Sequence, residues 1–245
     1  MTARLYWFPI SHPSWAVRRM LELKGIPYEL VEVLPGNQRV HLRLARFRGG
    51  TVPAMRLDGR RIQGSRAIAR ALDELQPDPP LFPADPAARA AADQVERWGD
   101  EEFQNVPRRI MRYGLANDHG LRRWLAAQSP VPVPPGLSAT VTVPVAHYYA
   151  LLVKANEESA RRNVASLPEL LDRVDGLLAD GTISVESQTA VTYQVLCTVR
   201  ALEGFSDFEA IVSAHACAAA ARELFPDDFS STPVPRFVPP DWLPA

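Results

Sequence analysis

Cysteine is scarce in this 245-residue chain, and so are excess charge and long apolar runs. The two cysteines, Cys197 and Cys217, have no CxxC or Cys/His ligand spacing near them, which argues against both a disulfide framework and a zinc site. The 27 basic side chains nearly balance the 28 acidic ones, so the composition gives no reason to expect a nucleic-acid partner or an anionic membrane surface.

No apolar stretch reaches the roughly 18 residues that mark a membrane-spanning helix. The N-terminal residues carry one arginine and a short apolar run that Pro9 interrupts, which is unlike a signal peptide. We therefore expect a cytoplasmic protein with small, nearly neutral partners, without a membrane or nucleic-acid partner.

Short strands and helices alternate in the first third of the chain. Apolar periodicity and turn residues predict strands at 5–10, 28–33, 52–57 and 60–63, and helices at 13–24, 41–46 and 65–75. Asp58-Gly59 is a strong hairpin signal between the last two strands. This order predicts a thioredoxin-like α/β domain over residues 1–78, because strand–helix–strand crossovers favour parallel pairing.

The remainder is predicted to be an all-α helical bundle over residues 87–245, after a proline-rich linker at 76–86. Alanine, leucine, arginine and glutamate dominate it. Its clearest helices are expected at 146–162, 167–178, 189–202 and 217–224. Ser129 to Pro144 holds five prolines and is expected to be a long loop, and the tail from Thr232 to Pro244 is expected to be extended.

Residues at the junctions of these elements resemble the glutathione transferase superfamily, of the cytosolic, serine-type, bacterial kind. They are the Ser-x-x-Ser-x-x-Val-Arg pattern beginning at Ser11, the Val52-Pro53 pair, and Ser65-Arg-Ala-Ile68. A Leu-Pro-Glu-Leu-Leu-Asp run at 167–172 is also similar. The resemblance implies glutathione as co-substrate, no metal, a small electrophilic partner and a homodimer.

Ser11 is the catalytic residue that the resemblance implies, since serine-type members place a hydroxyl in this loop against the glutathione sulfur. Lowering a thiol pKa by about two units takes roughly 2.7 kcal/mol. One charge-assisted hydrogen bond and a helix dipole together supply that amount. Ser14 is the rival, although it falls inside the first helical turn. A simple helix cap remains the alternative for Ser11, and His12 is either a neighbour that tunes the site or a surface residue.

The remaining glutathione contacts are also carried over from the resemblance. Pro53 corresponds to the cis-proline of thioredoxin-like folds, which exposes the backbone of Val52 to the cysteinyl part of the tripeptide. Ser65 opens a helix whose free N–H groups suit the γ-glutamyl carboxylate, although a plain helix cap would also place a serine there. The family usually carries Glu or Gln before that serine. This chain has Gly64, and Gln63 is the nearest substitute.

The electrophile is expected to be hydrophobic and to bind against the first long helix of the bundle. Helical spacing offers a mixed face for this pocket, made of Trp98, Glu102, Arg109 and Tyr113. Arg108, Arg109 and Arg112 would suit an acidic substrate, although the pattern favours a solvated basic face. Thr189 and Thr192 align with the capping motif of the family.

The sequence therefore predicts a glutathione transferase in which Ser11 holds the thiolate. Two alternatives stay open. One is a glutathione-dependent isomerase or a reductive lyase or dehalogenase of the same superfamily. The other is a transferase-like binding module without turnover, which the Gly64 departure favours.

Overall fold

The computed structural model describes residues 2–34, 36–129, 132–226 and 233–244. The first third forms a four-stranded sheet with three helices. Its elements are β1 (Ala3–Trp7), α1 (His12–Leu23), β2 (Tyr28–Glu32), α2 (Gln38–Leu44), β3 (Ala54–Leu57), β4 (Arg60–Gln63) and α3 (Ser65–Leu75). This confirms the predicted thioredoxin-like domain. The first strand ends at Trp7 rather than at Ile10, because Phe8 to Ile10 turn toward the helix.

The sheet order is β2-β1-β3-β4. β1 pairs in parallel with β2 and antiparallel with β3, and β3 pairs antiparallel with β4. Asp58 and Gly59 join the last two strands with positive φ values of 44° and 87°. The predicted hairpin is therefore correct, and its turn is of the type that favours an Asp-Gly pair.

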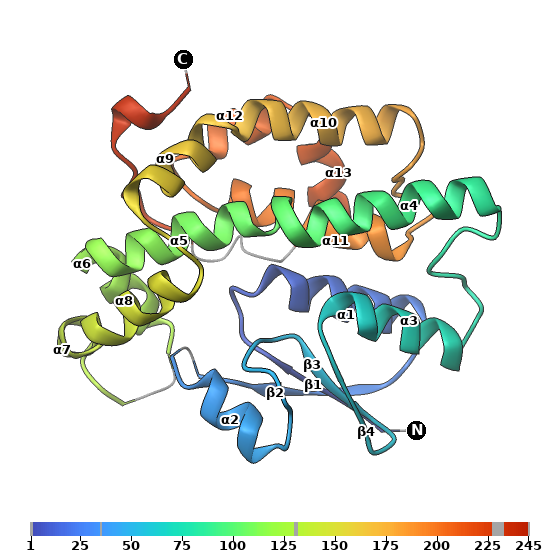
Figure 1. The fold of residues 1–245 in the computed structure, drawn as a ribbon, viewed down its shortest axis with the longest axis horizontal. Helices are drawn as coiled ribbons and strands as arrows, with labels where there is room; N and C mark the ends of the chain where they lie inside the picture. Colours follow the sequence, from blue (N-terminus) through green and yellow to red (C-terminus); the bar gives the residue numbers. More distant parts are fainter. Residues whose placement is uncertain (1, 35, 130–131, 227–232, 245) are drawn as a thin grey trace.

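Helices cover both faces of this sheet (Figure 1). α1 and α3 lie between the sheet and the helical domain, and their apolar faces join one core that runs through both domains. α2 covers the opposite face over a smaller cluster that includes Tyr6, Leu42 and Phe47. Tyr6 packs edge-on against Phe47 at 5.1 Å.

The rest of the described chain is almost entirely helical. Its helices are α4 (Pro86–Trp98), α5 (Asn105–Asn117), α6 (His119–Ala127), α7 (Pro135–Val141), α8 (Val143–Leu152), α9 (Glu157–Ala165), α10 (Leu167–Ala179), α11 (Ala190–Glu203), α12 (Glu209–Ser213) and α13 (Ala216–Leu224). This confirms the predicted helical bundle. None of the described helices is long and apolar enough to cross a membrane.

The structure corrects two predictions in this domain. The proline-rich stretch 129–144 contains α7, because Pro135 occupies the first turn, where its missing N–H costs no hydrogen bond. The predicted helix 146–162 is two helices, with a break in which Lys154 has a φ of 54°. Residues 130–131 of the predicted loop and Thr232 of the predicted tail lie outside the described residues.

Thr189 caps the central helix α11. Its side chain accepts a hydrogen bond from the Thr192 N–H, and the two hydroxyls lie 3.0 Å apart. This confirms the predicted cap. Both cysteines are buried and free of any disulfide.

Lys24 fastens the end of α1 to the interdomain linker. Its ammonium is fully buried and donates to Asp73 Oδ1 at 2.7 Å. The same group donates to the carbonyls of Gln76 and Pro79 at 2.5 and 2.6 Å. Three acceptors satisfy the three ammonium protons, so this charge is compensated inside the protein.

Candidate functional site

A cavity of about 630 Å³ lies between the two domains. The sheet domain contributes wall residues from the loop before α1, from the turn before β3 and from the start of α3. The opposite wall comes from α5, and α8 contributes a third side (Figure 1). The Tyr149 hydroxyl on α8 donates to the Gly36 carbonyl at 3.2 Å, which ties this side to the sheet domain.

The structure brings five of the predicted residues to the same cavity. They are Ser11, Val52, Pro53, Gly64 and Ser65. These residues come from three separate stretches of the chain, and the sheet topology places the three stretches side by side. The arrangement matches the one that the resemblance implied from their positions along the sequence.

Ser11 occupies the N-cap position of α1, but its side chain caps no backbone N–H. Instead, Ser11 Oγ lies 2.8 Å from Ser14 Oγ. Ser14 is fully buried. The simple cap therefore does not account for the Ser11 hydroxyl, which stands at the positive end of a helix and on the wall of a cavity.

The peptide bond between Val52 and Pro53 is cis, as the resemblance implied. Val52 lies before β3, outside the paired register of the sheet, which begins at Ala54. Its backbone is thus on the cavity wall and beyond the last ladder pair. A peptide-like ligand can pair with backbone in this position.

Gly64 is the N-cap of α3 and has a φ of 90°, a conformation that favours glycine. Ser65 is the first residue of the helix and is buried at the cavity. Gly64 and not Ser65 thus occupies the cap position of this helix. The helix N-terminus beside it offers free backbone N–H groups and partial positive charge, which suit a carboxylate.

Gln63 does not border the cavity. Its Oε1 accepts from the Gly49 N–H and its Nε2 donates to the Thr51 carbonyl, both at 2.8 Å. Both ends of the amide are therefore engaged in holding the loop that leads to Val52. The side chain therefore stabilises this wall of the cavity. It does not replace the Glu or Gln that the family usually carries at the position of Gly64.

The four residues predicted to receive the electrophile are not among the described residues that line the cavity. Trp98 stacks on Phe103 at 5.0 Å, and Glu102 is exposed. Arg109 donates to the Val153 carbonyl at 3.2 Å, and Tyr113 packs on Trp242 at 5.5 Å.

A local change of helix type accounts for part of this difference. Residues 99–103 form a π-helical turn, in which the Gln104 N–H donates to the Gly99 carbonyl. This wider turn rotates the helix that follows relative to a regular α-helix. Residues picked by regular helical spacing from Trp98 therefore do not lie on the face of α5 that borders the cavity. The face on the cavity carries Gln104, Arg108, Met111, Arg112 and Leu115.

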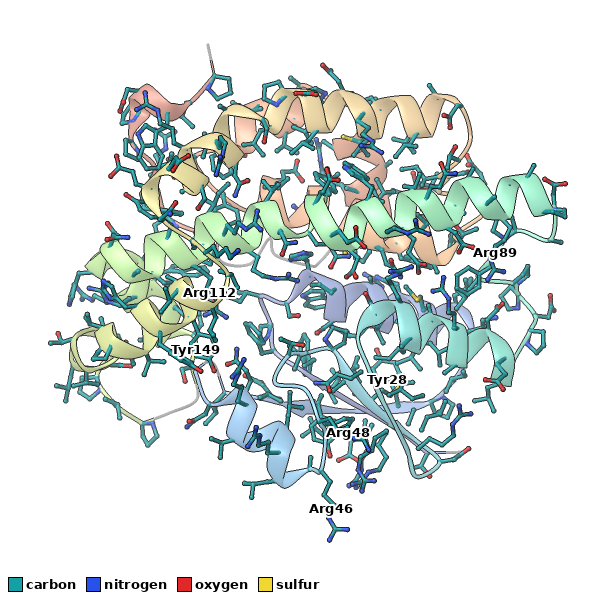
Figure 2. All side chains as sticks on the ribbon, in the orientation of Figure 1. Tyr28, Arg46, Arg48, Arg89, Arg112 and Tyr149 are labelled. Atoms are coloured by element: carbon teal, nitrogen blue, oxygen red, sulfur yellow. The ribbon has the colours of Figure 1, made fainter. Side chains whose placement is uncertain are left out.

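Arg108 and Arg112 point a concentrated positive charge into the site, and Figure 2 shows Arg112 beside Tyr149. Arg108 Nη1 donates to Asn105 Oδ1 at 2.6 Å, and the Arg112 guanidinium lies 4.8 Å from the Tyr149 ring centre. Neither arginine forms an ion pair with a carboxylate among the described residues. Burial lowers the pKa of both. This pair is therefore not a solvated basic face, and it is suited to an anion.

His12 also lines the cavity and is buried. Burial, and after it the positive charge of Arg108, lowers the pKa of His12 to about 3. The imidazole is thus neutral at physiological pH, and its Nε2 has no hydrogen-bond partner among the described residues. It does not add positive charge beside Ser11.

Several wall residues carry no local signal in the sequence and were not predicted. Gln104 and Trp124 are examples, from the turn before α5 and from α6. A second cavity, of about 470 Å³, lies at the linker and is bordered by Phe82, Ala88 and Thr182. None of the predicted site residues lines that cavity.

Residues 5–80 match the protein family described as "Glutathione S-transferase, N-terminal domain". A similar curated protein is maleylacetoacetate isomerase from Rattus norvegicus, 40% identical over 109 residues, which are 42% of this chain and 50% of the relative. The chain thus spans about half the length of the curated relatives that it matches.

Solved structures extend the similarity of fold to both domains. The β-etherase LigF from Sphingobium sp. strain SYK-6 has a TM-score of 0.58 and 22% identity, over 92% of this chain and 99% of that one. Poplar glutathione transferase F1 has a TM-score of 0.62 and 18% identity, over 93% of each chain.

Proposed function

We propose that this chain, whose residues 5–80 match the glutathione S-transferase N-terminal domain, is an enzyme that holds the glutathione sulfur as a thiolate at Ser11. One observation carries this proposal. A single cavity is lined by Ser11, whose hydroxyl caps no backbone N–H, by the Val52–Pro53 turn and by the N-terminus of α3. These are a donor for sulfur, a backbone edge for a peptide and a site for a carboxylate. Glutathione has all three groups.

The electrophile in this proposal is an acidic molecule bound against α5. Asp100 lines the same cavity and its carboxylate interacts electrostatically with Arg108, but neither Arg108 nor Arg112 forms an ion pair with a carboxylate among the described residues. An anionic ligand therefore compensates the positive charge that one carboxylate leaves. Met111 and Leu115 lie on the same face of the helix and supply apolar contact. The earlier assignment of Trp98, Glu102, Arg109 and Tyr113 to this role has no support from the cavity.

The reaction favoured by these groups is cis–trans isomerisation of an acidic alkene conjugated to a carbonyl. The thiolate adds to one alkene carbon, and the electron pair of the double bond moves to the carbonyl oxygen. Rotation about the new single bond follows, and the enolate then re-forms the double bond and expels the thiolate. Glutathione is regenerated. Curated relatives named maleylacetoacetate isomerase, together with the paired arginines, favour this outcome over transfer to a neutral electrophile.

Transfer, in which the thioether is the product, is the second candidate. The glutathione thiolate held at Ser11 serves either outcome, because both begin with the same attack on carbon. Glutathione acts as co-substrate in both, and no metal takes part. We also retain a homodimer and a cytoplasmic location as parts of the proposal.

The test has two stages. Titration calorimetry with glutathione asks whether the intact chain binds the tripeptide, and proton NMR then follows a maleyl substrate and a neutral aryl halide with and without glutathione. The proposal expects binding and glutathione-dependent conversion of the maleyl compound to its trans isomer. Absence of glutathione binding would instead identify a transferase-like module or an enzyme of another thiol.

A further inference from the structure

Two serine hydroxyls lie next to each other at the start of α1. Ser11 borders the cavity, and Ser14, whose Oγ lies 2.8 Å from Ser11 Oγ, is not among the residues that line it. Ser14 is fully buried, and Ser11 is 7% exposed. The rival candidate of the sequence is therefore in direct contact with the favoured one.

The role proposed for Ser11 sets the direction of this hydrogen bond, in which either oxygen can be the donor. Each hydroxyl has one proton to donate and two lone pairs that accept. If Ser11 donates its proton to a thiolate, it has none left for Ser14, so Ser14 must be the donor between the two oxygens. Ser14 is free to do so, because its hydroxyl has no other hydrogen bond within the described part of the chain.

Few backbone N–H groups at the start of α1 are available to donate to a sulfur. The Ser14 N–H and the Trp15 N–H are both engaged with the Ser11 carbonyl, and Pro13 has no N–H at all. The first turn of α1 therefore presents few free backbone donors to a sulfur at its N-terminus. An aimed Ser11 O–H becomes correspondingly more important.

We propose that Ser14 is a positioning residue that donates its proton to Ser11 Oγ and thereby aims the Ser11 O–H at the glutathione sulfur. This inference rests on the proposed function. A hydroxyl that accepts a hydrogen bond is polarised and becomes a better donor, an effect of about 10–30% per bond in a chain of hydrogen bonds. Ser14 also limits the rotation of Ser11, so less freedom is lost when the sulfur binds.

The test is the pKa of the glutathione thiol in the complex, read from thiolate absorbance in the ultraviolet as the pH is varied. Ser14→Ala should raise that pKa by about 0.3–1 unit, which is a two- to tenfold loss of thiolate at a pH below it. The dissociation constant for glutathione near neutral pH should change less than about threefold. Ser14→Thr, which keeps the hydroxyl, should restore the wild-type pKa. Should the alanine variant fold poorly, Ser14→Cys removes the strong donor at similar size, and the same shift is expected.

Thr198→Val is the matched control. Thr198 is fully buried, and its hydroxyl bonds the Gln194 carbonyl in α11, so the change also deletes a buried helical hydroxyl. It should leave the thiol pKa unchanged. An unchanged thiol pKa in Ser14→Ala, or a rise of the thiol pKa in Thr198→Val equal to that in Ser14→Ala, would overturn the proposed role of Ser14. Either result would leave the proposed role of Ser11 intact. A wild-type protein that binds glutathione without lowering its pKa, or does not bind it, would overturn both.

Discussion

The guanidinium of Arg112 lies 4.8 Å from the centre of the Tyr149 ring, and both side chains border the cavity (Figure 2). This contact joins α5 to α8. The negative face of the Tyr149 ring attracts the positive charge of Arg112, with which no carboxylate among the described residues forms an ion pair. Arg108, one helical turn earlier, stands on the same wall.

Replacing these arginines should separate acidic from neutral substrates. Arg108→Met and Arg112→Met should each raise KM for a maleyl substrate by about 10- to 100-fold, since hydrogen bonds to charged groups contribute about 1.5–3 kcal/mol. The rate with a neutral aryl halide should change much less. Steady-state kinetics on both substrates measures the difference.

Arg109→Met is the control for this pair, because Arg109 lies beside both residues but bonds the Val153 carbonyl and does not line the cavity. Equal losses in all three variants would show that bulk positive charge, or stability, is responsible. Equal losses on acidic and neutral substrates would likewise contradict the assigned role.

Gly64 offers a direct test of the departure from the family pattern. A Cβ added there meets nothing within 4 Å, but the φ of 90° strains any L side chain. Gly64→Gln should therefore lower the free energy of unfolding by about 1–2 kcal/mol. It should also tighten glutathione binding, because it restores a side chain that the family usually places beside the α3 N-terminus.

Gly64→Ala separates these two effects. It carries the same backbone strain but lacks the amide, so it should lose stability without gaining affinity. Urea unfolding and calorimetric titration give the two quantities. Glutathione affinity that is the same in the glutamine and alanine variants would refute the assigned contact.

His12 should make the protein less stable as the pH falls below neutral. Its pKa is lowered from 6.5 to about 3 in the folded state, first by burial and then by Arg108. Between these values the unfolded chain binds a proton that the folded chain does not, so acid favours unfolding. From pH 7 to pH 5 this costs about 2 kcal/mol of unfolding free energy.

His12→Asn should lose that part of the pH dependence, and urea unfolding at the two pH values measures it. His119→Asn, at an exposed position, is the control and should keep the full wild-type slope. Parallel slopes in the wild type and in His12→Asn would show that the imidazole is not held neutral.

The sheet domain could be predicted almost completely from the sequence, because local signals agree with one another there. Asp58-Gly59 specifies a hairpin, and Gly25 ends a helix, so the register follows from short-range chemistry. The resemblance then located Ser11, Val52 and Ser65, which the fold brings to one cavity.

The helical domain was less predictable for a physical reason. α5 packs on the rest of the bundle through apolar residues, whereas its cavity face mixes apolar residues with Arg108 and Arg112, next to Arg109 in the sequence. Periodicity therefore does not distinguish Arg108 from Arg109. The π-helical turn at 99–103 has no sequence signature that would have corrected the phase.

The most direct test of the account is the ionisation of glutathione bound to the wild type and to Ser11→Ala, followed by thiolate absorbance across pH. The account predicts a bound thiol about two pKa units below free glutathione in the wild type, and loss of most of that shift, with turnover, in Ser11→Ala. A variant that binds glutathione and keeps both the shifted pKa and the rate would contradict it.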